Sequence, residues 1–351
     1  MYARSSEKND GSIGMDKNIT VATMQFKNDV KVSTTEYLKT YYTFKLGDIA
    51  FEGYQSKEFR YGRFVENDIG NGIVSHIFAV FRPIQEYDLY FWKYAINNET
   101  LMQRILARST KASTMMHDLV TNDFLNETFL VPSVKEQKQI GAFLNKLDNL
   151  ITLHQRKCEQ TKKLKKYMLQ KMFPQNGAKV PEIRFDGFTY DWEQRKLGDE
   201  AEEILAGGDI DKEKAVDDGV YPIYANALTN DGIVGYYDDY YRVKAPAVTV
   251  TGRGEVGRAR ARMIDFTPVV RLLAVRSNHD CYFLENAINN HKVVVESTGV
   301  PQLTVPQLSS YDICFPKDIV EEKKIGTYFN QLDRLITLHQ RQHKLHLNML
   351  L

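Results

Sequence analysis

A ten-residue stretch occurs twice in this chain, and this repeat restricts the possible folds more than any other feature. Residues 147–156 read Leu-Asp-Asn-Leu-Ile-Thr-Leu-His-Gln-Arg, and residues 332–341 repeat nine of the ten letters. The similarity continues upstream at the same offset of 185 residues, where Glu-Gln-Lys-Gln-Ile-Gly at 136–141 matches Glu-Glu-Lys-Lys-Ile-Gly at 321–326. A duplication of this kind predicts two copies of one structural unit.

Both copies have the pattern of a long helix that packs on another helix. Apolar or small residues recur in alternating steps of four and three, which is the heptad seam of a paired helix. We expect the two antiparallel helices to pack on each other about an approximate two-fold axis. The alternative is that each seam docks on its own globular domain. The predicted seam, which is also the predicted subunit interface, consists of Ile140, Leu144, Leu147, Ile151, His154, Ile325, Phe329, Leu332, Ile336 and His339.

His154 and His339 occupy equivalent seam positions and could meet across the axis. Two imidazoles without a carboxylate or thiolate nearby make a poor zinc site. We therefore interpret them as polar seam residues that fix the register of the helices, and we predict no metal site.

The length of 351 residues exceeds that of one hydrophobic core, so two domains are expected. The predicted order is a domain at 1–132, a long helix at 133–174, a second domain at 175–316 and a second, slightly shorter helix at 317–351. Each domain has the mixed pattern of an α+β fold. Within them we expect a weakly held segment at 1–18, a strand at 73–81, a helix at 87–107, a final strand at 129–132 and a helix at 284–295.

Composition limits the cellular context and the partners. The net charge is only +1, so a nucleic-acid site would need basic residues gathered locally. Cys158, Cys281 and Cys314 form no CxxC pair, which fits a reducing cytoplasm. No apolar run approaches the roughly 18 residues of a membrane span, and the N-terminus lacks an apolar signal core. A cytoplasmic protein without a membrane partner is expected.

The most informative pattern outside the repeat is a glycine-rich stretch followed by alternating arginines. Gly-x-Gly-x-x-Gly at 252–257 matches the dinucleotide fingerprint, but that motif requires a helix directly after it. Here Arg258, Arg260 and Arg262 alternate with small residues, which predicts a strand with the arginines on one face. We interpret the glycines as a hairpin connection. Arginine can fork onto guanine or phosphate, although each of the three could equally be a solvated surface residue.

Further basic, aromatic and hydroxyl residues complete the candidate DNA-binding set. In the first domain a basic and aromatic loop is the expected counterpart of the arginine row, and a Ser-Thr pair in each domain precedes the final strand. A constellation of nucleophile, base or metal ligands is not apparent, so an enzyme is not predicted. The candidates are Lys57, Arg60, Tyr61, Arg63, Ser109, Thr110, Lys111, Ser113, Thr114, Arg253, Arg258, Arg260, Arg262, Ser297, Thr298 and Gln302, with Ser109-Thr110 and Ser113-Thr114 as rival counterparts of Ser297-Thr298.

Three stretches carry a family resemblance. They are Trp-Glu-Gln-Arg-Lys-Leu-Gly-Asp at 192–199, Ser-Thr-Gly-x-Pro-Gln at 297–302, and the repeated Glu-x-Lys-x-Ile-Gly leading into the ten-residue stretch. From about residue 19 to residue 347 the chain resembles the specificity subunit of type I restriction-modification systems. The resemblance implies a non-catalytic reader of double-stranded DNA, in which each domain is a target recognition domain for one half of a bipartite sequence. The helices would act as a ruler that sets the gap between the halves.

The resemblance also implies partners and cofactors. Two methyltransferase subunits would dock on the helices and methylate adenine N6 with S-adenosylmethionine that they hold themselves. Restriction and translocase subunits would join them and use ATP and Mg²⁺, so no cofactor is expected in this chain.

Two departures from the family pattern keep an alternative open. The first domain lacks a full counterpart of 192–199, which predicts a truncated or rearranged domain, and the last residue is equivalent to Lys166 of the first helix. The alternative is a stand-alone, truncated or antirestriction-like DNA-binding scaffold that no longer supports methylation.

Overall fold

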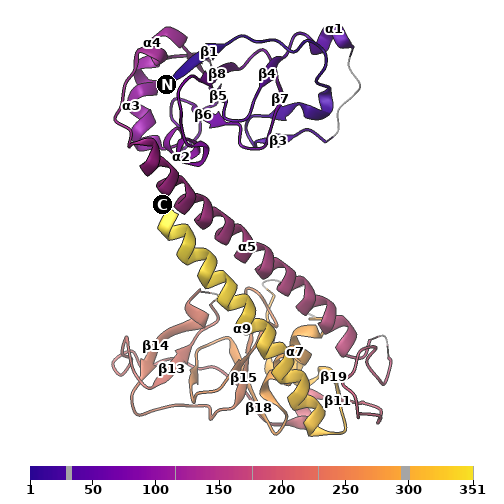
Figure 1. The fold of residues 1–351 in the computed structure, drawn as a ribbon. Coiled ribbons are helices and arrows are strands. Elements are labelled where there is room, and N and C mark those ends of the chain that lie inside the picture. The colour runs from indigo at the N-terminus through magenta and orange to yellow at the C-terminus, as the bar shows by residue number, and fades with distance from the viewer. Residues whose placement is uncertain (29–33, 115, 176, 228, 294–300, 351) are drawn as a thin grey trace. The chain divides into compact units, whose positions relative to one another are not determined.

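The computed structural model describes residues 1–28, 34–114, 116–175, 177–227, 229–293 and 301–350, and it divides into two compact units (Figure 1). Unit 1 comprises Met1–Ile151 with His346–Leu351, and unit 2 comprises Thr152–Leu345. The helix α5, Val134–Met172, begins in unit 1 and continues into unit 2. The helix α9, Ile319–Leu350, lies almost entirely in unit 2.

Unit 1 is built on a four-stranded antiparallel sheet of order β1-β8-β5-β6. Its elements are β1 Tyr2–Ser5, η1 Met15–Lys17, β2 Ile19–Thr20, β3 Gln25–Phe26, α1 Thr35–Leu38, β4 Tyr42–Phe44, β5 Ile49–Glu52, β6 Arg63–Glu66, β7 Gly72–Val74, β8 Ala79–Pro83, α2 Leu89–Ala95, α3 Glu99–Ser109, β9 Thr110–Ala112, β10 His117–Leu119 and α4 Thr121–Asn126. Side chains alternate between the sheet faces, so Phe51 and Phe64 pack on the side of α2 and α3. Ala50 and Val65 join a separate apolar cluster on the other side.

Unit 2 repeats this plan with a sheet of order β12-β18-β15-β16. Its elements are β11 Glu193–Lys196, α6 Leu197–Glu200, β12 Ala201–Ala206, β13 Tyr221–Tyr224, η2 Thr229–Gly232, β14 Ile233–Tyr237, β15 Ala247–Thr251, β16 Ala259–Arg262, β17 Thr267–Pro268, β18 Leu272–Ser277, α7 Cys281–Asn290, α8 Val305–Ser309 and β19 Asp312–Phe315. In both units the four strands lie in the order first, fourth, second, third along the chain. The predicted α+β class and the internal repeat are therefore confirmed.

Each long helix docks on its own domain through the repeated Glu-x-Lys-x-Ile-Gly motif. The side chain of Asp88 caps α2 by accepting a hydrogen bond from the Phe91 N–H at 2.8 Å, and Asp280 caps α7 in the same way through Phe283 at 2.9 Å. The motif's glycine packs directly on this cap, since a Cβ at Gly141 would lie 2.1 Å from Asp88 Oδ1 and one at Gly326 would lie 2.0 Å from Asp280 Oδ1.

A side chain one turn before each glycine completes the contact. Gln137 Oε1 accepts hydrogen bonds from the Asp88 N–H and from Trp92 Nε1, both at 3.2 Å. Glu322 Oε2 accepts one from the Asp280 N–H at 3.1 Å. Both copies of the motif therefore make the same kind of contact with their own domain.

Unit 2 adds a histidine that bridges two carboxylates at the start of α9. His279 Nδ1 lies 2.9 Å from Glu322 Oε1, and its Nε2 lies 3.0 Å from Glu200 Oε2. Burial favours the neutral imidazole, but Glu322 and Glu200 outweigh it and raise the pKa of His279 above its usual value of 6.5. The bridge therefore stabilises unit 2 most when the ring is charged.

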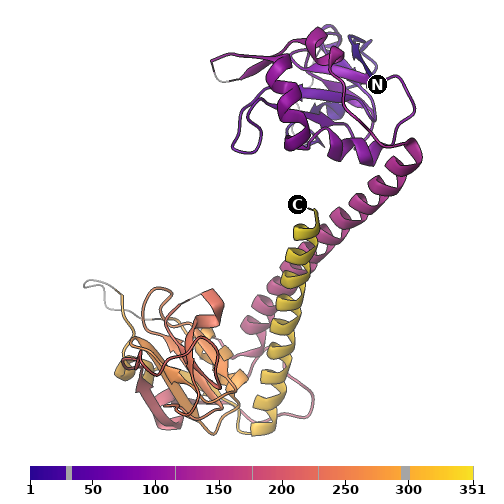
Figure 2. The same cartoon turned by 90° about the vertical axis from the view of Figure 1, so that its left-hand side faces the viewer.

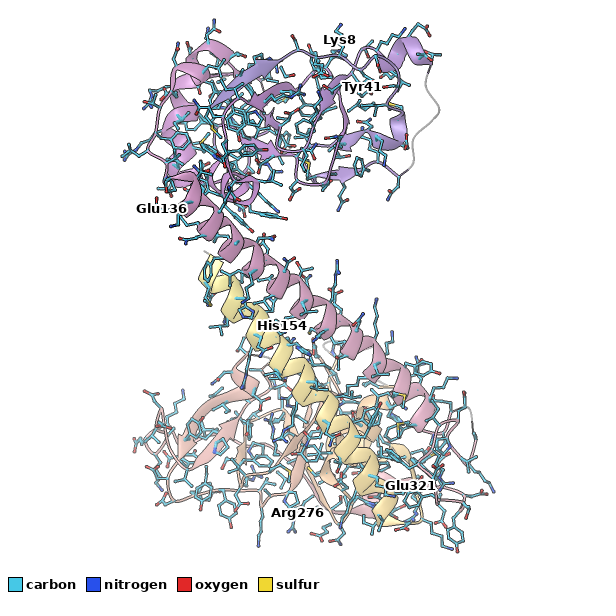
Figure 3. All side chains as sticks on the ribbon, viewed as in Figure 1. Lys8, Tyr41, Glu136, His154, Arg276 and Glu321 are labelled. Carbon is cyan, nitrogen blue, oxygen red and sulfur yellow. The ribbon has the colours of Figure 1, made fainter. Side chains whose placement is uncertain are left out.

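Between residues 152 and 345 the two long helices pack on each other in antiparallel fashion (Figures 1 and 2). His154 of α5, labelled in Figure 3, approaches His339 of α9 with 3.2 Å between the Nδ1 atoms. Further along, Lys165 Nζ lies 2.7 Å from Asp333 Oδ2. Phe173, just after α5, packs on Phe329 with ring centroids 6.0 Å apart. The predicted pairing is confirmed in this region, and so is the meeting of the two histidines.

The seam prediction is only partly right at the start of each helix. Ile140 is 41% exposed, because the face of its helical turn that docks on the domain carries Gln137 and Gly141 instead. Ile325 is buried, but in the core of the unit 2 domain together with Phe329 and Leu332. The first turns of α9 therefore follow the alternative in which the stripe docks on its own domain. Leu147 is buried, and Leu144, Ile151 and Ile336 are half-buried.

Three local predictions in unit 1 are wrong for identifiable reasons. Residues 1–18 are not weakly held, because β1 pairs with β8 at the sheet edge. The strand expected at 73–81 is two strands, β7 and β8, separated by a turn. The helix expected at 87–107 is interrupted before α3, where the Asn98 side chain accepts a hydrogen bond from the Leu101 N–H at 3.0 Å and starts a new helix.

The final strands of the two units also differ from expectation. In unit 2, β19 forms because β11 pairs with it. In unit 1 the main sheet begins with β1 at Tyr2, so no described residues take the place of β11. The segment 129–132 is consequently not a strand, and Leu130 is fully exposed.

In unit 2, α7 covers Cys281–Asn290 instead of the predicted 284–295, because Asp280 caps the helix earlier in the chain. Residues 294 and 295 lie outside the described residues.

Replacing Gly326 by alanine tests the docking contact. In an exposed helix this change would stabilise by about 1 kcal/mol. Here the new methyl group would meet Asp280 and the Phe283 N–H, so we expect a loss of about 1–3 kcal/mol in the free energy of unfolding of unit 2. Urea unfolding followed by circular dichroism measures it. Thr327→Ala, at the exposed neighbouring position, is the control, and a Gly326→Ala protein as stable as that control would contradict the docking model.

The histidine bridge gives a pH dependence. Because the folded-state pKa of His279 is raised, its contribution is fully present below the unfolded-state pKa and is lost as the pH rises through the folded-state value. The stability difference between the wild type and His279→Gln should therefore be larger at about pH 6 than at about pH 9. Chemical denaturation at both pH values measures this difference, and a constant difference would show that the ring acts through packing alone.

Candidate nucleic-acid interface

The glycine-rich stretch of unit 2 is the connection of a β-hairpin, as predicted. β15 pairs antiparallel with β16, and Val250 lies opposite Ala259. Gly257 has a φ of 83°, and a Cβ there would lie 2.5 Å from a Val293 methyl carbon. The Arg258 N–H then donates to Thr251 Oγ1 at 2.9 Å, which fixes the start of the arginine row.

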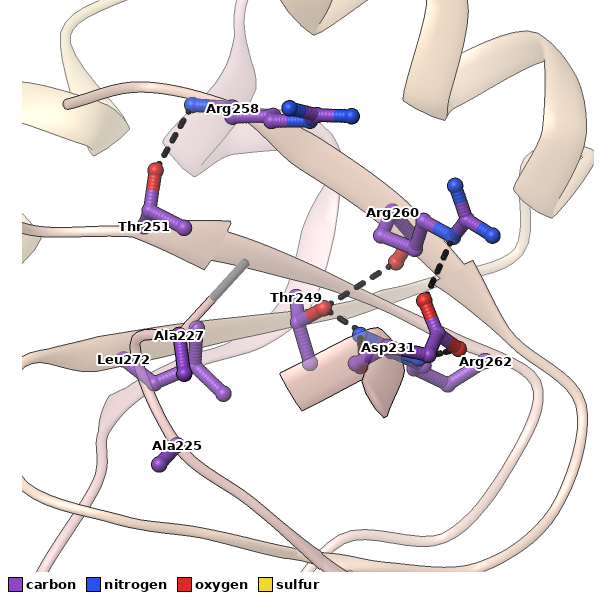
Figure 4. A pocket seen from close by; sticks show the side chains of 9 residues that line it. All are labelled: Ala225, Ala227, Asp231, Thr249, Thr251, Arg258, Arg260, Arg262 and Leu272. Atoms are coloured by element: carbon purple, nitrogen blue, oxygen red, sulfur yellow. Dashed lines mark hydrogen bonds and ion pairs between the residues drawn. The ribbon is translucent and has the colours of Figure 1, made fainter. Parts of the chain in front are cut away.

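The arginine row faces a cavity of about 250 Å³ (Figure 4). The cavity lies on the face of the sheet opposite Val250 and Leu273, which pack with α7. The alternation of the strand places Ala259 in the apolar cluster that contains Phe283, Leu284, Ala287 and Ile288 of α7, and Ala261 packs against the same cluster. The predicted common face of the three arginines is thereby confirmed. The cavity is lined by Ala225, Ala227, Asp231, Thr249, Thr251, Arg258, Arg260, Arg262 and Leu272.

The three arginines are not equivalent. Arg258 is exposed and pairs with Glu255 at 2.8 Å. Arg260 is half-exposed and its Nε lies 3.1 Å from Asp231 Oδ1. Both side chains can therefore reach a ligand that enters the cavity.

Arg262 is only 8% exposed, contrary to the expected row of surface guanidinium groups. Its Nη1 lies 2.6 Å from Asp231 Oδ2, and its Nε donates to Thr249 Oγ1 at 3.1 Å. Its guanidinium carbon lies 3.7 Å from the centre of the Tyr224 ring. These contacts make Arg262 the fixed base of the cavity.

Sequence reasoning missed Asp231, Tyr224 and Thr249. Asp231 lies in an Asn-Asp-Gly turn, a turn signal that carries no information about its distant partner. Only the fold brings it, about thirty residues earlier in the chain, to the arginine row.

The remaining candidates of unit 2 lie around the same hairpin. Arg253 is half-buried, and its carbonyl accepts a hydrogen bond from the Asn226 side chain. Gln302 is exposed next to Leu303, whose N–H donates to the Gly252 carbonyl at 2.9 Å. Ser297 and Thr298 lie outside the described residues.

In unit 1 the equivalent connection runs from β5 to β6, residues 53–62. The His117 N–H donates to the Gly53 carbonyl at 2.8 Å, just as Leu303 does to Gly252. Tyr54 also forms a β-bridge with Met116. The predicted correspondence of the two basic loops is confirmed by the topology. The same contacts bring the loop at 53–62 beside the β9–β10 hairpin, so two candidate groups of unit 1 share one surface.

The individual side chains of this surface differ in exposure. Lys57 and Arg60 are exposed, and the Arg60 guanidinium lies 5.5 Å from the Tyr61 ring centre. The Tyr61 ring in turn contacts the His117 ring edge-on, with centroids 5.3 Å apart. Arg63 is half-buried in an ion pair with Glu52 at 2.9 Å.

The hydroxyl residues of unit 1 divide into buried and exposed groups. Ser109 is fully buried and its Oγ donates to the Ile105 carbonyl at 2.8 Å, so it is unsuited to contact a ligand. Thr110 is half-buried and donates to the Leu106 carbonyl at 2.6 Å. Lys111, Ser113 and Thr114 are exposed, which favours Ser113-Thr114 over Ser109-Thr110 as surface residues.

Comparison with known proteins assigns the family. A model of the "Type I restriction modification DNA specificity domain" matches residues 3–163 and 190–348. One curated type I specificity subunit of Mycoplasma pneumoniae is 27% identical over 237 residues, which is 63% of this chain and 62% of that protein. Another is 30% identical over 148 residues, or 40% of this chain and 43% of that protein. The aligned region thus spans less than two thirds of either relative.

Solved structures agree on the fold. The S subunit of a type I restriction-modification system from M. genitalium has a TM-score of 0.65 at 15% identity, covering 100% of this chain and 91% of that one. A chain from a structure on complex assembly and conformational transition of the type I R-M system has a TM-score of 0.51 at 15% identity, covering 99% and 94%. In the part of the chain that the structure describes, no helix is long and apolar enough to cross a membrane. The chain belongs to the family of type I restriction modification DNA specificity domains, and it carries two copies of that domain.

Proposed function

We propose that this chain is the DNA-reading subunit of a type I restriction-modification complex, with one target recognition domain in each unit. The observation that carries the proposal is that both units have the same β-hairpin connection, with basic side chains on each. In both units a long helix also docks on the domain through the same glycine contact. Arginine and lysine at such loops supply phosphate contacts and can fork onto guanine. Each unit would read one half of a bipartite double-stranded target.

The chemistry of the complex is assigned to partner subunits. Members of this family are specificity subunits and are generally non-catalytic. Two methyltransferase subunits would bind the long helices and supply S-adenosylmethionine for adenine methylation. Restriction subunits with ATP and Mg²⁺ would join through them. The paired helices would set the gap between the half-sites.

The two units also differ in a way that fits two different half-sites. The outer face of the unit 2 sheet carries Thr249 and Arg260 at the cavity. In unit 1 that face carries Ala50 and Val65, which are covered by apolar residues of the β2, β4 and β7 region. A stand-alone scaffold would not need two docked helices, so we do not favour that alternative.

Methylation mapping tests the function and the ruler together. Co-expression with the cognate methyltransferase should yield adenine methylation at one two-part motif, read by single-molecule sequencing. Removing one heptad from each paired helix shortens the spacer by about 10 Å. The gap in the motif should change while the half-site bases stay the same. Altered bases with an unchanged gap would refute the ruler, and methylation without a bipartite motif would refute the function.

Arginine substitutions test the unit 2 surface. Arg258→Ala and Arg260→Ala should each weaken binding to the half-site of unit 2 and lower the slope of log K against log salt by about one. Arg276→Ala, with the same change in charge outside the cavity, is the control. Arg262→Met should instead lower the stability of unit 2 by about 1–3 kcal/mol, because it leaves the buried Thr249 hydroxyl without its donor. If Arg258→Ala, Arg260→Ala, Arg262→Met and Arg276→Ala all bind DNA with equal affinity, this face of unit 2 does not contact DNA.

A further inference from the structure

The cavity of unit 2 already contains its own anion. Three guanidinium groups line it, and Asp231 pairs with two of them, at 3.1 Å from Arg260 and 2.6 Å from Arg262. Glu255 pairs with the third, Arg258, at 2.8 Å. Most of the positive charge of the row is thus neutralised within the unit.

The backbone presents the Asp231 carboxylate to the arginines. Asn230 and Asp231 have φ values of 49° and 52°, in the left-handed region that asparagine and aspartate tolerate better than most residues. The Asp231 carbonyl accepts a further hydrogen bond from Arg262 Nη2 at 3.1 Å. In Figure 4 the Asp231 side chain lies between Arg260 and Arg262. The turn therefore holds the Asp231 carboxylate in a position beside Arg260 and Arg262 that the oxygens of another anion could also occupy.

The arginines and the carboxylate differ in how firmly they are held. Arg262 has Thr249 and the Tyr224 ring as additional partners, so it keeps its position when the carboxylate leaves. The Asp231 side chain is 46% exposed and can turn into solvent. Half-exposed ion pairs of this kind contribute little to stability, which makes the exchange of one anion for another feasible.

We propose that the cavity is a binding site for a single phosphate group and that Asp231 is an internal counter-ion which the phosphate displaces. Arginine forks match the oxygens of a phosphate, and Thr249 and Thr251 line the same space. The volume of about 250 Å³ is several times the share of one water molecule, about 30 Å³, and so admits the group. Given the proposed function, on which this identification rests, the phosphate is one of the DNA backbone, and Asp231 weakens contact with DNA that does not present a phosphate at this point.

Asp231→Asn tests the proposal in the full-length chain. Asparagine tolerates the left-handed backbone, so the turn should persist while the charge is lost. The control is Asp239→Asn, which removes one negative charge from an exposed position of the same unit. Asp231→Asn should bind duplex DNA about two- to fivefold more tightly than Asp239→Asn, as expected for a half-exposed ion pair. Asp231→Gly, which also suits a positive φ, should show the same gain if the asparagine variant folds poorly.

A second arm uses inorganic phosphate as the probe, monitored by calorimetry. Asp231→Asn should bind it more tightly than the wild type, and adding Arg260→Gln should abolish most of that gain. If phosphate binding improves but no DNA binds to any variant, the site stands and the proposed DNA-reading function fails. If the wild type binds DNA but Asp231→Asn and Asp239→Asn bind DNA and phosphate equally, the counter-ion proposal is overturned while the function remains.

Discussion

The contact between a glycine of each long helix and the capped helix of its domain is the constraint on which both units depend. A Cβ at Gly141 or Gly326 would overlap the carboxylate that caps α2 or α7. One turn earlier in each helix, Gln137 accepts a hydrogen bond from the Asp88 N–H and Glu322 accepts one from the Asp280 N–H. Because the first turns of the helices have one face on the domain, the close approach of the glycine backbone, together with the Gln137 or Glu322 side chain, fixes their direction relative to that domain.

At one end of their paired region the two long helices pack through buried apolar side chains, and further along they meet through polar side chains. Phe329 and Leu332 belong to the same buried cluster as Met172 and Phe173, so burial of apolar area dominates there. Lys165 and Asp333 form a partly exposed pair, which contributes at most about 1 kcal/mol. The contact of His154 with His339 adds little apolar burial but marks one register, because a shift by one turn would separate the rings. Packing thus holds the pair, and polar residues set its alignment.

Periodicity in the sequence predicted what depends on local spacing, and it missed what depends on distant partners. The first long helix and the common face of the arginines follow from periods of 3.5 and 2. Residues 129–132 do not form the predicted strand, because a strand needs a neighbour and β11 has no counterpart among the described residues of unit 1. The burial of Arg262 could not be predicted from the sequence either, because only the fold brings Asp231 and Tyr224 into contact with it.

The strand period also explains how two copies of one fold can carry different chemistry. In each sheet one set of side chains faces the helices, as Val250 and Phe51 do, while the alternate set faces outward. The equivalent outward pair is apolar in unit 1, where Ala50 lies opposite Val65, and polar in unit 2, where Thr249 lies opposite Arg260. Substitutions in the outward set leave the helix-facing core and the glycine contact unchanged. After the duplication, the recognition surfaces could therefore diverge without disturbing the docking of the helices.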